Sequence, residues 1–219
     1  MPEPLLYKSP PSGGRPVEAV TLVLHGGKEW SREPTSARAL SVLRMHFVTW
    51  HLQRRRRDHP LAVWMLRYKI RGWNGDEMSP LGDVRWALDQ VRAEHGNVPI
   101  ALVGHSMGGR SALRCAGGQA RVVVGLAPWV PDGEPVAQLA GCQVLIAHGT
   151  RDLTTSPRRS RGFAGEAAGV AAMVRWIGVR RSGHGMIWRA RAWHRLTSSF
   201  VLGALGFGPA VTLPDDARV

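Results

Sequence analysis

Short apolar runs alternate with longer amphipathic segments along this chain. Each apolar run is nearly continuous and is stopped by glycine, proline or polar residues, which is typical of a strand buried on both faces. Strands are predicted over six runs: Val17 to Leu24, Leu61 to Tyr68, Val98 to Val103, Arg121 to Leu126, Gln143 to Ala147 and Met173 to Val179. Because such strands belong to parallel sheets covered by helices, the pattern favours a mostly parallel sheet.

Helical periodicity fills the segments between these runs. Helices are predicted over Ser36 to Arg57, Leu81 to His95, Met107 to Gly117, Pro157 to about Ala168 and Ile187 to Leu202. In the first helix, Ser36 is the expected N-cap. Its apolar residues recur at helical spacing, at Leu40, Leu43, Phe47, Trp50 and Leu52. The alternation predicts an α/β chain with a doubly wound sheet of about six to seven strands and helices on both faces.

A chain of 219 residues is expected to form one main domain with a full hydrophobic core. The expected division is an N-terminal segment at residues 1–16, the domain at 17–207 and a flexible tail at 208–219. Cys115 and Cys142 are the only cysteines. Their spacing matches neither a metal site nor a redox pair, so both are expected to be buried thiols.

Basic residues dominate the charge, with 29 Lys and Arg against 16 Asp and Glu and a net charge of +13. Such a field attracts polyanions, but most of the arginines are scattered singly. The exceptions are Arg54 to Arg57 and the group Arg158, Arg159 and Arg161. The first run lies at a predicted helix end, where cations complement the helix dipole, so a solvated helix end is favoured over a nucleic-acid patch.

Neither a signal peptide nor a stretch long enough to span a membrane is visible. The sequence therefore predicts a cytoplasmic protein with no membrane partner and no specific nucleic-acid partner. It contains nothing that indicates the oligomeric state.

The pentapeptide Gly104 to Gly108 matches the pattern G-x-S-x-G and stands between a predicted strand and a predicted helix. A sharp strand-to-helix turn places the serine in a strained conformation, and the flanking glycines avoid clashes with neighbouring backbone. Ser106 is therefore expected to project its hydroxyl at the C-terminal edge of the sheet. The N–H of Met107 is positioned at a helix N-terminus to receive an oxyanion.

Three further segments each follow a predicted strand. His25-Gly26-Gly27 follows the first strand, where a glycine turn presents a second backbone N–H, from Gly27 or Lys28. Asp152 follows the fifth strand and His184 the sixth, so a serine, an acid and a histidine occur in that order along the chain.

The segments LVLHGG, LVGHSMGG, LIAHGTRD and SGHG together resemble the α/β-hydrolase family over roughly Val17 to Leu202. The resemblance implies the α/β-hydrolase fold, with Ser106 as nucleophile, His184 as general base and later acid, and Asp152 as the carboxylate that orients the imidazole. It also implies an acyl-enzyme formed through an oxyanion that the amides of Met107 and of Gly27 or Lys28 hold. This chemistry requires no metal and no organic cofactor.

The sequence also contains a second candidate for the acid and three further histidines near the predicted site. Asp132 follows the fourth strand, where some relatives place their acid, although Asp152 is favoured. His25, His105 and His148 each follow a strand or lie inside a turn, and packing and hydrogen bonding are their expected roles.

The loops around the predicted nucleophile suggest an open site. Ala127 to Cys142 is too short for a lid domain. Trp30 and Trp129 fall on loops that surround the nucleophile in this fold, and Trp73 and Met186 are candidates to join them. These side chains could bind an apolar acyl group or an aromatic group of the substrate, or they could cap the hydrophobic core. The sequence leaves both interpretations open.

The first functional hypothesis is a small, lidless serine esterase acting on a small-molecule ester. Its serine departs from the carboxylate nucleophile of dehalogenase-like and epoxide-hydrolase relatives, and from the cysteine of the dienelactone hydrolase type. A thioesterase of a biosynthetic pathway would use the same residues. Hypotheses from other classes are a non-catalytic binding protein of this fold and a polyanion-binding protein.

Overall fold

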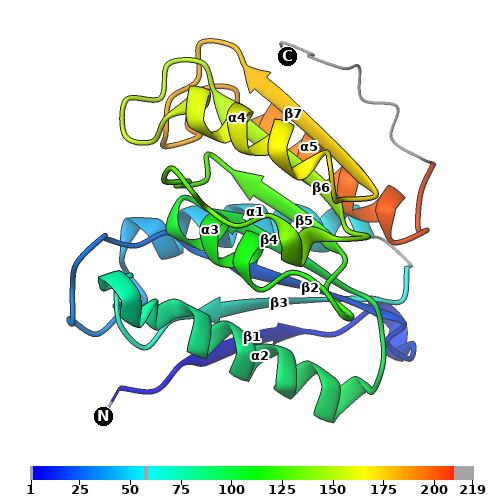
Figure 1. Ribbon diagram of the computed structural model, residues 1–219. Coiled ribbons are helices and arrows are strands. Elements are labelled where there is room, and N and C mark those ends of the chain that lie inside the picture. Colours follow the sequence, from blue (N-terminus) through cyan, green and yellow to red (C-terminus); the bar gives the residue numbers. More distant parts are fainter. Residues whose placement is uncertain (1, 57–58, 210–219) are drawn as a thin grey trace.

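A seven-stranded sheet runs through the centre of the molecule, in the strand order β1-β3-β2-β4-β5-β6-β7 (Figure 1). The computed structural model describes residues 2–56 and 59–209. The strands are β1 (Leu5–Ser9), β2 (Ala19–Leu24), β3 (Leu61–Arg67), β4 (Ile100–His105), β5 (Val122–Leu126), β6 (Gln143–Gly149) and β7 (Met173–Val179). All neighbouring pairs are parallel except β1 and β3, which confirms the predicted mostly parallel, doubly wound sheet.

Helices cover both faces of this sheet (Figure 1). One face carries α2 (Ser79–His95), α3 (Met107–Arg114) and α4 (Pro157–Ala167), and the other carries α1 (Leu40–Arg56) and α5 (Ala190–Ala204). Short 3₁₀ turns are η1 (Ser12–Gly14), η2 (Gly75–Glu77) and η3 (Ala137–Leu139).

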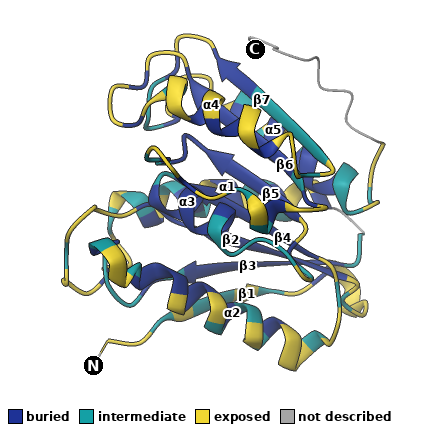
Figure 2. Ribbon diagram, viewed as in Figure 1, coloured by how far each residue is buried: buried dark blue, intermediate teal, exposed yellow. Residues whose placement is uncertain are grey.

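Each strand contributes to two hydrophobic clusters, one on either face of the sheet. In β2, Leu22 and Leu24 pack toward α2 and α3, whereas Ala19 and Val23 pack toward α1 and α5. Because both faces are covered, successive side chains are all buried, and the central strands are buried throughout (Figure 2). This is the physical reason for the continuous apolar runs in the sequence.

The edge strand β1 is the element that the apolar pattern did not predict. It pairs antiparallel with β3, from Leu5 opposite Arg67 to Ser9 opposite Val63, so the sheet extends into residues 1–16. Its side chains are only partly covered, as expected at a sheet edge, and no continuous apolar run marks it. The guanidinium of Arg56 connects β1 to the sheet by donating to the carbonyls of Ser9 and Leu61, both at 3.0 Å.

The face of α1 that packs on the sheet is not the one that the apolar stripe in the sequence indicated. Four members of that stripe are exposed: Leu40, Leu43, Phe47 and Trp50. The buried face instead carries Val42, Met45, Val48, Thr49 and Leu52. A helix with apolar side chains on two sides satisfies helical spacing in two ways, and only its packing against the sheet selects one.

Both ends of α1 also differ from the prediction. Ser36 is not the N-cap, because its Oγ and its carbonyl accept the N–H groups of Arg38 and Ala39 in a separate turn, and the helix begins at Leu40. At the other end Arg56 is buried rather than part of a solvated cluster. Arg57 lies outside the described residues.

The connection between β5 and β6, residues 127–142, contains only the short turn η3 and inserts no lid domain. Cys115 is half-buried and Cys142 is buried, and both are free thiols. Burial raises the pKa of Cys115 to about 11.

Within the described ranges, no helix combines the length and the apolar character needed to cross a membrane. Residues 210–219, most of the predicted C-terminal tail, lie outside the described residues.

Two buried histidines stand at the ends of neighbouring strands. Burial lowers the pKa of His25, just after β2, to about 4 and that of His105, at the end of β4, to about 3. The Nδ1–H of His25 donates to the carbonyl of Gly26 at 2.6 Å, and its Nε2 accepts the N–H of Tyr68 at 3.1 Å. This pairing requires a neutral imidazole and joins the glycine turn after β2 to the end of β3.

We expect Gly108→Ala to lower the free energy of unfolding by about 2 kcal/mol or more, because overpacking against rigid backbone forces strain. A Cβ there would lie 2.4 Å from the carbonyl oxygen of His25 and 2.5 Å from that of Leu24. Gly82→Ala in α2 is the matched control, since its Cβ meets nothing within 4 Å and alanine is the better helix former by about 1 kcal/mol. Urea unfolding measures both variants, and equal losses would contradict the close contact at Gly108.

The free energy of unfolding is expected to fall as the pH drops from about 6.5 toward 4. Unfolded histidines take up protons near pH 6.5, whereas His25 and His105 do so only near pH 4 and 3, so the unfolded state binds more protons between these values. Two such groups give a slope of up to about 2.7 kcal/mol per pH unit near pH 5. His25→Gln should reduce that slope by about half in urea titrations at several pH values, and an unchanged slope would show that His25 is not responsible.

Candidate active site

Ser106 occupies the turn between β4 and α3 in a strained backbone conformation. Its φ of 56° and ψ of −118° lie in a region that residues other than glycine rarely adopt. Three backbone hydrogen bonds hold it there. Its N–H donates to the carbonyl of Leu126 at 3.0 Å, and its carbonyl accepts the N–H groups of Trp129 and Arg110, both at 3.1 Å. The end of β5 and the loop that follows it therefore fix the serine turn.

Glycines surround this turn because backbone segments approach one another closely there. A Cβ at Gly104 would lie 2.0 Å from the carbonyl oxygen of Gly108, and a Cβ at Gly108 would lie 2.4 Å from that of His25, which explains both glycines of the G-x-S-x-G pattern. A Cβ at Gly26 would lie 3.3 Å from the Cβ of Ser106. The glycine turn after β2 is thus a direct neighbour of Ser106.

The structure brings His184 and Asp152 into contact. The Nδ1 of His184 lies 2.8 Å from Oδ2 of Asp152, whose side chain is completely buried. Asp152 follows β6 and His184 follows β7, and the two loops are joined by the N–H of Arg151 donating to the carbonyl of Ser182 at 2.9 Å. The rival acid Asp132 instead forms an exposed ion pair with Arg159 at 3.0 Å.

Every oxygen of the Asp152 carboxylate has hydrogen-bond donors. Oδ1 accepts the N–H groups of Thr154 at 2.8 Å and Thr155 at 2.9 Å, and Oδ2 accepts the Thr155 hydroxyl at 2.9 Å. Burial alone would raise the pKa of this carboxyl, but hydrogen bonds from His148, His184 and the two backbone amides outweigh it and hold the pKa well below its usual range. Asp152 is therefore ionised at neutral pH.

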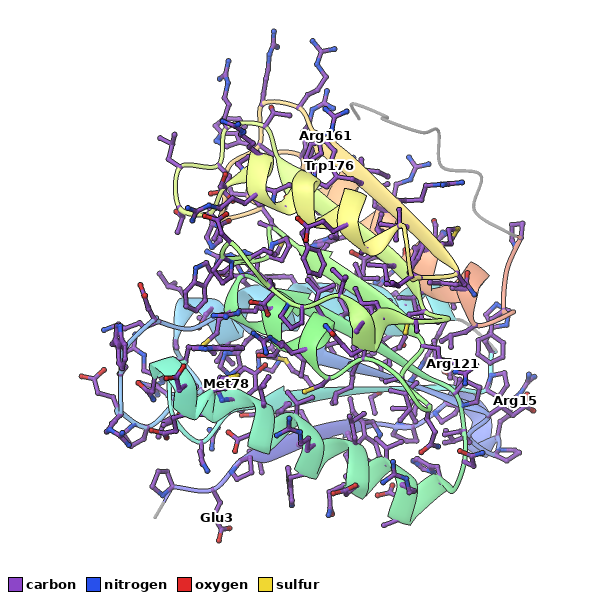
Figure 3. The ribbon with its side chains drawn as sticks, viewed as in Figure 1. Glu3, Arg15, Met78, Arg121, Arg161 and Trp176 are labelled. Carbon is purple, nitrogen blue, oxygen red and sulfur yellow. The ribbon has the colours of Figure 1, made fainter. Side chains whose placement is uncertain are left out.

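His148 is a second histidine on the same carboxylate, a contact that the sequence did not predict. It is fully buried, and its Nε2 lies 3.2 Å from Oδ2 of Asp152. Its Nδ1 lies 2.8 Å from Oγ of Ser160, which also accepts the indole N–H of Trp176 at 3.0 Å. Trp176 lies on β7 with Arg161 beside it (Figure 3). The only signal in the sequence was the four-residue spacing between His148 and Asp152.

Ser106 and His184 lie on the same edge of the sheet without a direct hydrogen bond. The Ser106 hydroxyl has no hydrogen-bond partner among residues 2–56 and 59–209. The connection runs through the neighbouring His105, whose Nε2–H donates to the carbonyl of His184 at 2.9 Å, with the two rings 4.7 Å apart. Hydrogen bonds between nucleophile and base are often long in unliganded sites and tighten with substrate.

The three backbone N–H groups predicted to hold the oxyanion differ in whether they already have a hydrogen-bond acceptor. The N–H groups of Met107, the first residue of α3, and of Gly27 donate to no group in the described part of the chain. The N–H of Lys28, in contrast, donates to the carbonyl of Arg71 at 2.8 Å. Of the two candidates for the second oxyanion donor, Gly27 is therefore the one with an available amide.

The four residues predicted to contact substrate divide into two pairs. Trp73 and Met186 are buried and belong to the two hydrophobic clusters. The Arg110 guanidinium, paired with Glu134 at 2.8 Å, lies 3.9 Å from the ring centre of Trp73 and 4.7 Å from that of Trp129. This burial favours the core role for Trp73 and Met186. Trp129 is half-buried and Trp30 is exposed, and both remain predicted substrate contacts.

A cavity of about 620 Å³ lies between residues 130–134 and α4. Its lining contains none of the predicted catalytic or substrate-binding residues. In the described segments, no group of three or more His, Cys, Asp or Glu side chains is arranged to hold a metal ion.

Comparison with known proteins agrees with this fold. The Alpha/beta hydrolase family model matches residues 21–217. No curated protein matches the chain. Similar solved structures include an alpha-beta serine hydrolase homologue from Coxiella burnetii, which is 15% identical with a TM-score of 0.68, covering 89% of this chain and 90% of that one.

Two further solved structures show the same similarity of fold. Est1E from Butyrivibrio proteoclasticus is 14% identical with a TM-score of 0.70, covering 93% of this chain and 95% of that one. The thermophilic esterase Est2 from Thermogutta terrifontis is 17% identical with a TM-score of 0.69, covering 96% and 90%. Since the family match spans nearly the whole chain and the observed sheet agrees with it, this protein belongs to the alpha/beta hydrolase family.

Proposed function

We propose that this hydrolase is a serine esterase that cleaves a small-molecule carboxylic ester through an acyl-enzyme intermediate. The observation that carries the proposal is the 2.8 Å contact between His184 and Asp152 at the sheet edge where Ser106 stands in its strained turn. Support also comes from the similar folds of proteins that are described as a serine hydrolase homologue and a thermophilic esterase.

In the proposed reaction, the Oγ of Ser106 attacks the ester carbonyl carbon while Nε2 of His184 takes the hydroxyl proton. The negative charge on the carbonyl oxygen is stabilised by the N–H groups of Met107 and Gly27. When the tetrahedral intermediate collapses, the bond to the alcohol oxygen breaks and His184 gives its proton to the leaving alcohol. Water, activated by His184 in the same way, then releases the acid and restores Ser106.

The low pKa of Asp152 suits its proposed role in this reaction. A carboxylate that stays ionised holds Nδ1 of His184 in its protonated tautomer and stabilises the imidazolium that forms when the serine proton is transferred. Asp152 is itself oriented by His148 and Thr155. We assign these two residues a positioning role, since they act on the acid and not on the substrate.

A fluorophosphonate probe should label Ser106 in the purified protein, because only an activated serine attacks it rapidly. Peptide mass spectrometry locates the label. Ser106→Ala should abolish labelling and reduce hydrolysis of p-nitrophenyl esters by about 10⁴-fold or more, whereas Ser12→Ala, at an exposed serine in η1, should change neither. A folded wild-type protein that is not labelled would refute the proposal and favour a binding protein of this fold.

Substituting each of the two candidate acids separates their roles. Asp152→Asn should reduce kcat by up to about 10⁴-fold, because the amide favours the wrong tautomer of His184. Asp132→Asn removes only an exposed ion pair and should leave kcat nearly unchanged. Steady-state rates with p-nitrophenyl esters measure both variants. Rates of the wild-type protein with acyl thioesters test the substrate class, and a clear preference for thioesters over esters would identify a thioesterase instead of an esterase.

A further inference from the structure

The outer side of α1 carries a line of large apolar side chains that the fold leaves uncovered. Leu40, Leu43, Phe47 and Trp50 have exposed fractions of 77%, 41%, 65% and 53%. Their spacing of three, four and three residues places them along one side of the helix, over about 15 Å at a rise of 1.5 Å per residue. Packing against the sheet does not account for them, because the opposite side of α1 meets the sheet.

Two more exposed apolar residues follow His184 in the loop between β7 and α5. Ile187 and Trp188 have exposed fractions of 79% and 75%. A Cβ at Gly185 would lie 3.4 Å from Ile187 and 3.6 Å from the guanidinium of Arg44 on α1, so Ile187 lies near the end of the Arg44 side chain. We call these six residues of α1 and the loop the apolar ridge, and its loop end adjoins the candidate active site. Contiguous exposed apolar surface of this kind marks an interaction site.

The charge around the apolar ridge has one sign. No Asp or Glu occurs in residues 34–56 or 167–209, the stretches that contain α1, α5 and the loop before α5. The basic residues there that are exposed are Arg38, Arg54, Arg55, Arg180, Arg181, Arg189, Arg191 and Arg195. Within the described ranges none of these eight forms an ion pair. The acidic residues of α2 and α4 lie on the other face of the sheet.

Charge decides which partner fits this face. A second copy would bring unneutralised arginines against arginines, and like charges at an interface are unfavourable. A nucleic acid would match the charge but would leave the apolar ridge without a partner. A bilayer with anionic headgroups satisfies both, because the apolar side chains insert at the boundary of headgroups and acyl chains while arginines contact phosphates. Tryptophan favours this boundary, and the ridge carries two.

We propose that the face formed by α1, α5 and the loop 180–189 binds peripherally to bilayers that contain anionic phospholipid. This inference goes beyond the proposed esterase activity and stands without it. It departs from the sequence-based prediction of no membrane partner, which rested on the lack of a spanning segment. Peripheral binding requires no such segment, since one side of a surface helix supplies the insertion.

Co-sedimentation of the full chain with vesicles tests the proposal. We expect binding to phosphatidylcholine vesicles that contain phosphatidylglycerol, weak binding to phosphatidylcholine alone, and weakening by salt. The double variant Phe47→Ser, Trp50→Ser should lower the affinity at least about tenfold, as should Arg191→Gln combined with Arg195→Gln. Val170→Ser and Arg92→Gln, at exposed sites away from this face, are the matched controls and should bind as the wild type does.

Each alternative partner gives a distinct result. No binding to anionic vesicles, or binding that the ridge variants leave unchanged, would overturn the proposal. A wild-type dimer in light scattering that Phe47→Ser converts to a monomer, with no vesicle binding, would make the ridge an interface between copies. Salt-sensitive DNA binding without vesicle binding would make the face a nucleic-acid surface. Fluorophosphonate labelling of the same variants, expected to be unchanged, separates this test from that of the esterase activity.

Discussion

Around Ser106, backbone segments approach one another so closely that the positions between them have no room for a side chain. Gly104 and Gly108 face each other across the turn, and Gly108 also touches the carbonyls that end β2. This contact packs the start of α3 against two central strands at once. The glycine turn after β2 approaches the same turn, since a Cβ at Gly26 would lie 3.3 Å from the Cβ of Ser106. The position of Ser106 and the packing of α3 on β2 therefore both depend on these glycines.

The buried charge of Asp152 imposes the second constraint on the molecule. A carboxylate without water needs a donor for each lone pair, because an unpaired buried charge is strongly unfavourable. The donors come from the turn after β6, from His148 on β6 and from His184 in the loop after β7. Satisfying the acid thus holds two loops together. Through Ser160 and Trp176 the same network reaches α4 and β7.

The two faces of the sheet are equally well buried, yet their outer surfaces differ in character. The side with α2 and α4 carries both acidic and basic residues, with pairs such as Arg92 and Asp89. On the side with α1 and α5, the described stretches 34–56 and 167–209 carry arginine and exposed apolar side chains and contain no Asp or Glu. The net charge of +13 is therefore concentrated, and scatter along the sequence conceals it, because α1 and α5 are separated by more than half of the chain.

The sequence by itself determined the central strands and the helices between them. A strand that is buried on both faces of the sheet is a continuous apolar run, whatever the order of the strands in the sheet. It also determined that a serine, an acid and a histidine each follow a strand, in that order along the chain, and parallel strands bring such positions to one edge. Tertiary structure alone decided that Asp152 and not Asp132 contacts His184. It also decided that the N–H of Lys28 donates to the carbonyl of Arg71, and which side of α1 is buried. It also added β1, whose half-covered edge position leaves no apolar run. These features depend on distances between segments remote in sequence, and no local pattern of residues records such distances.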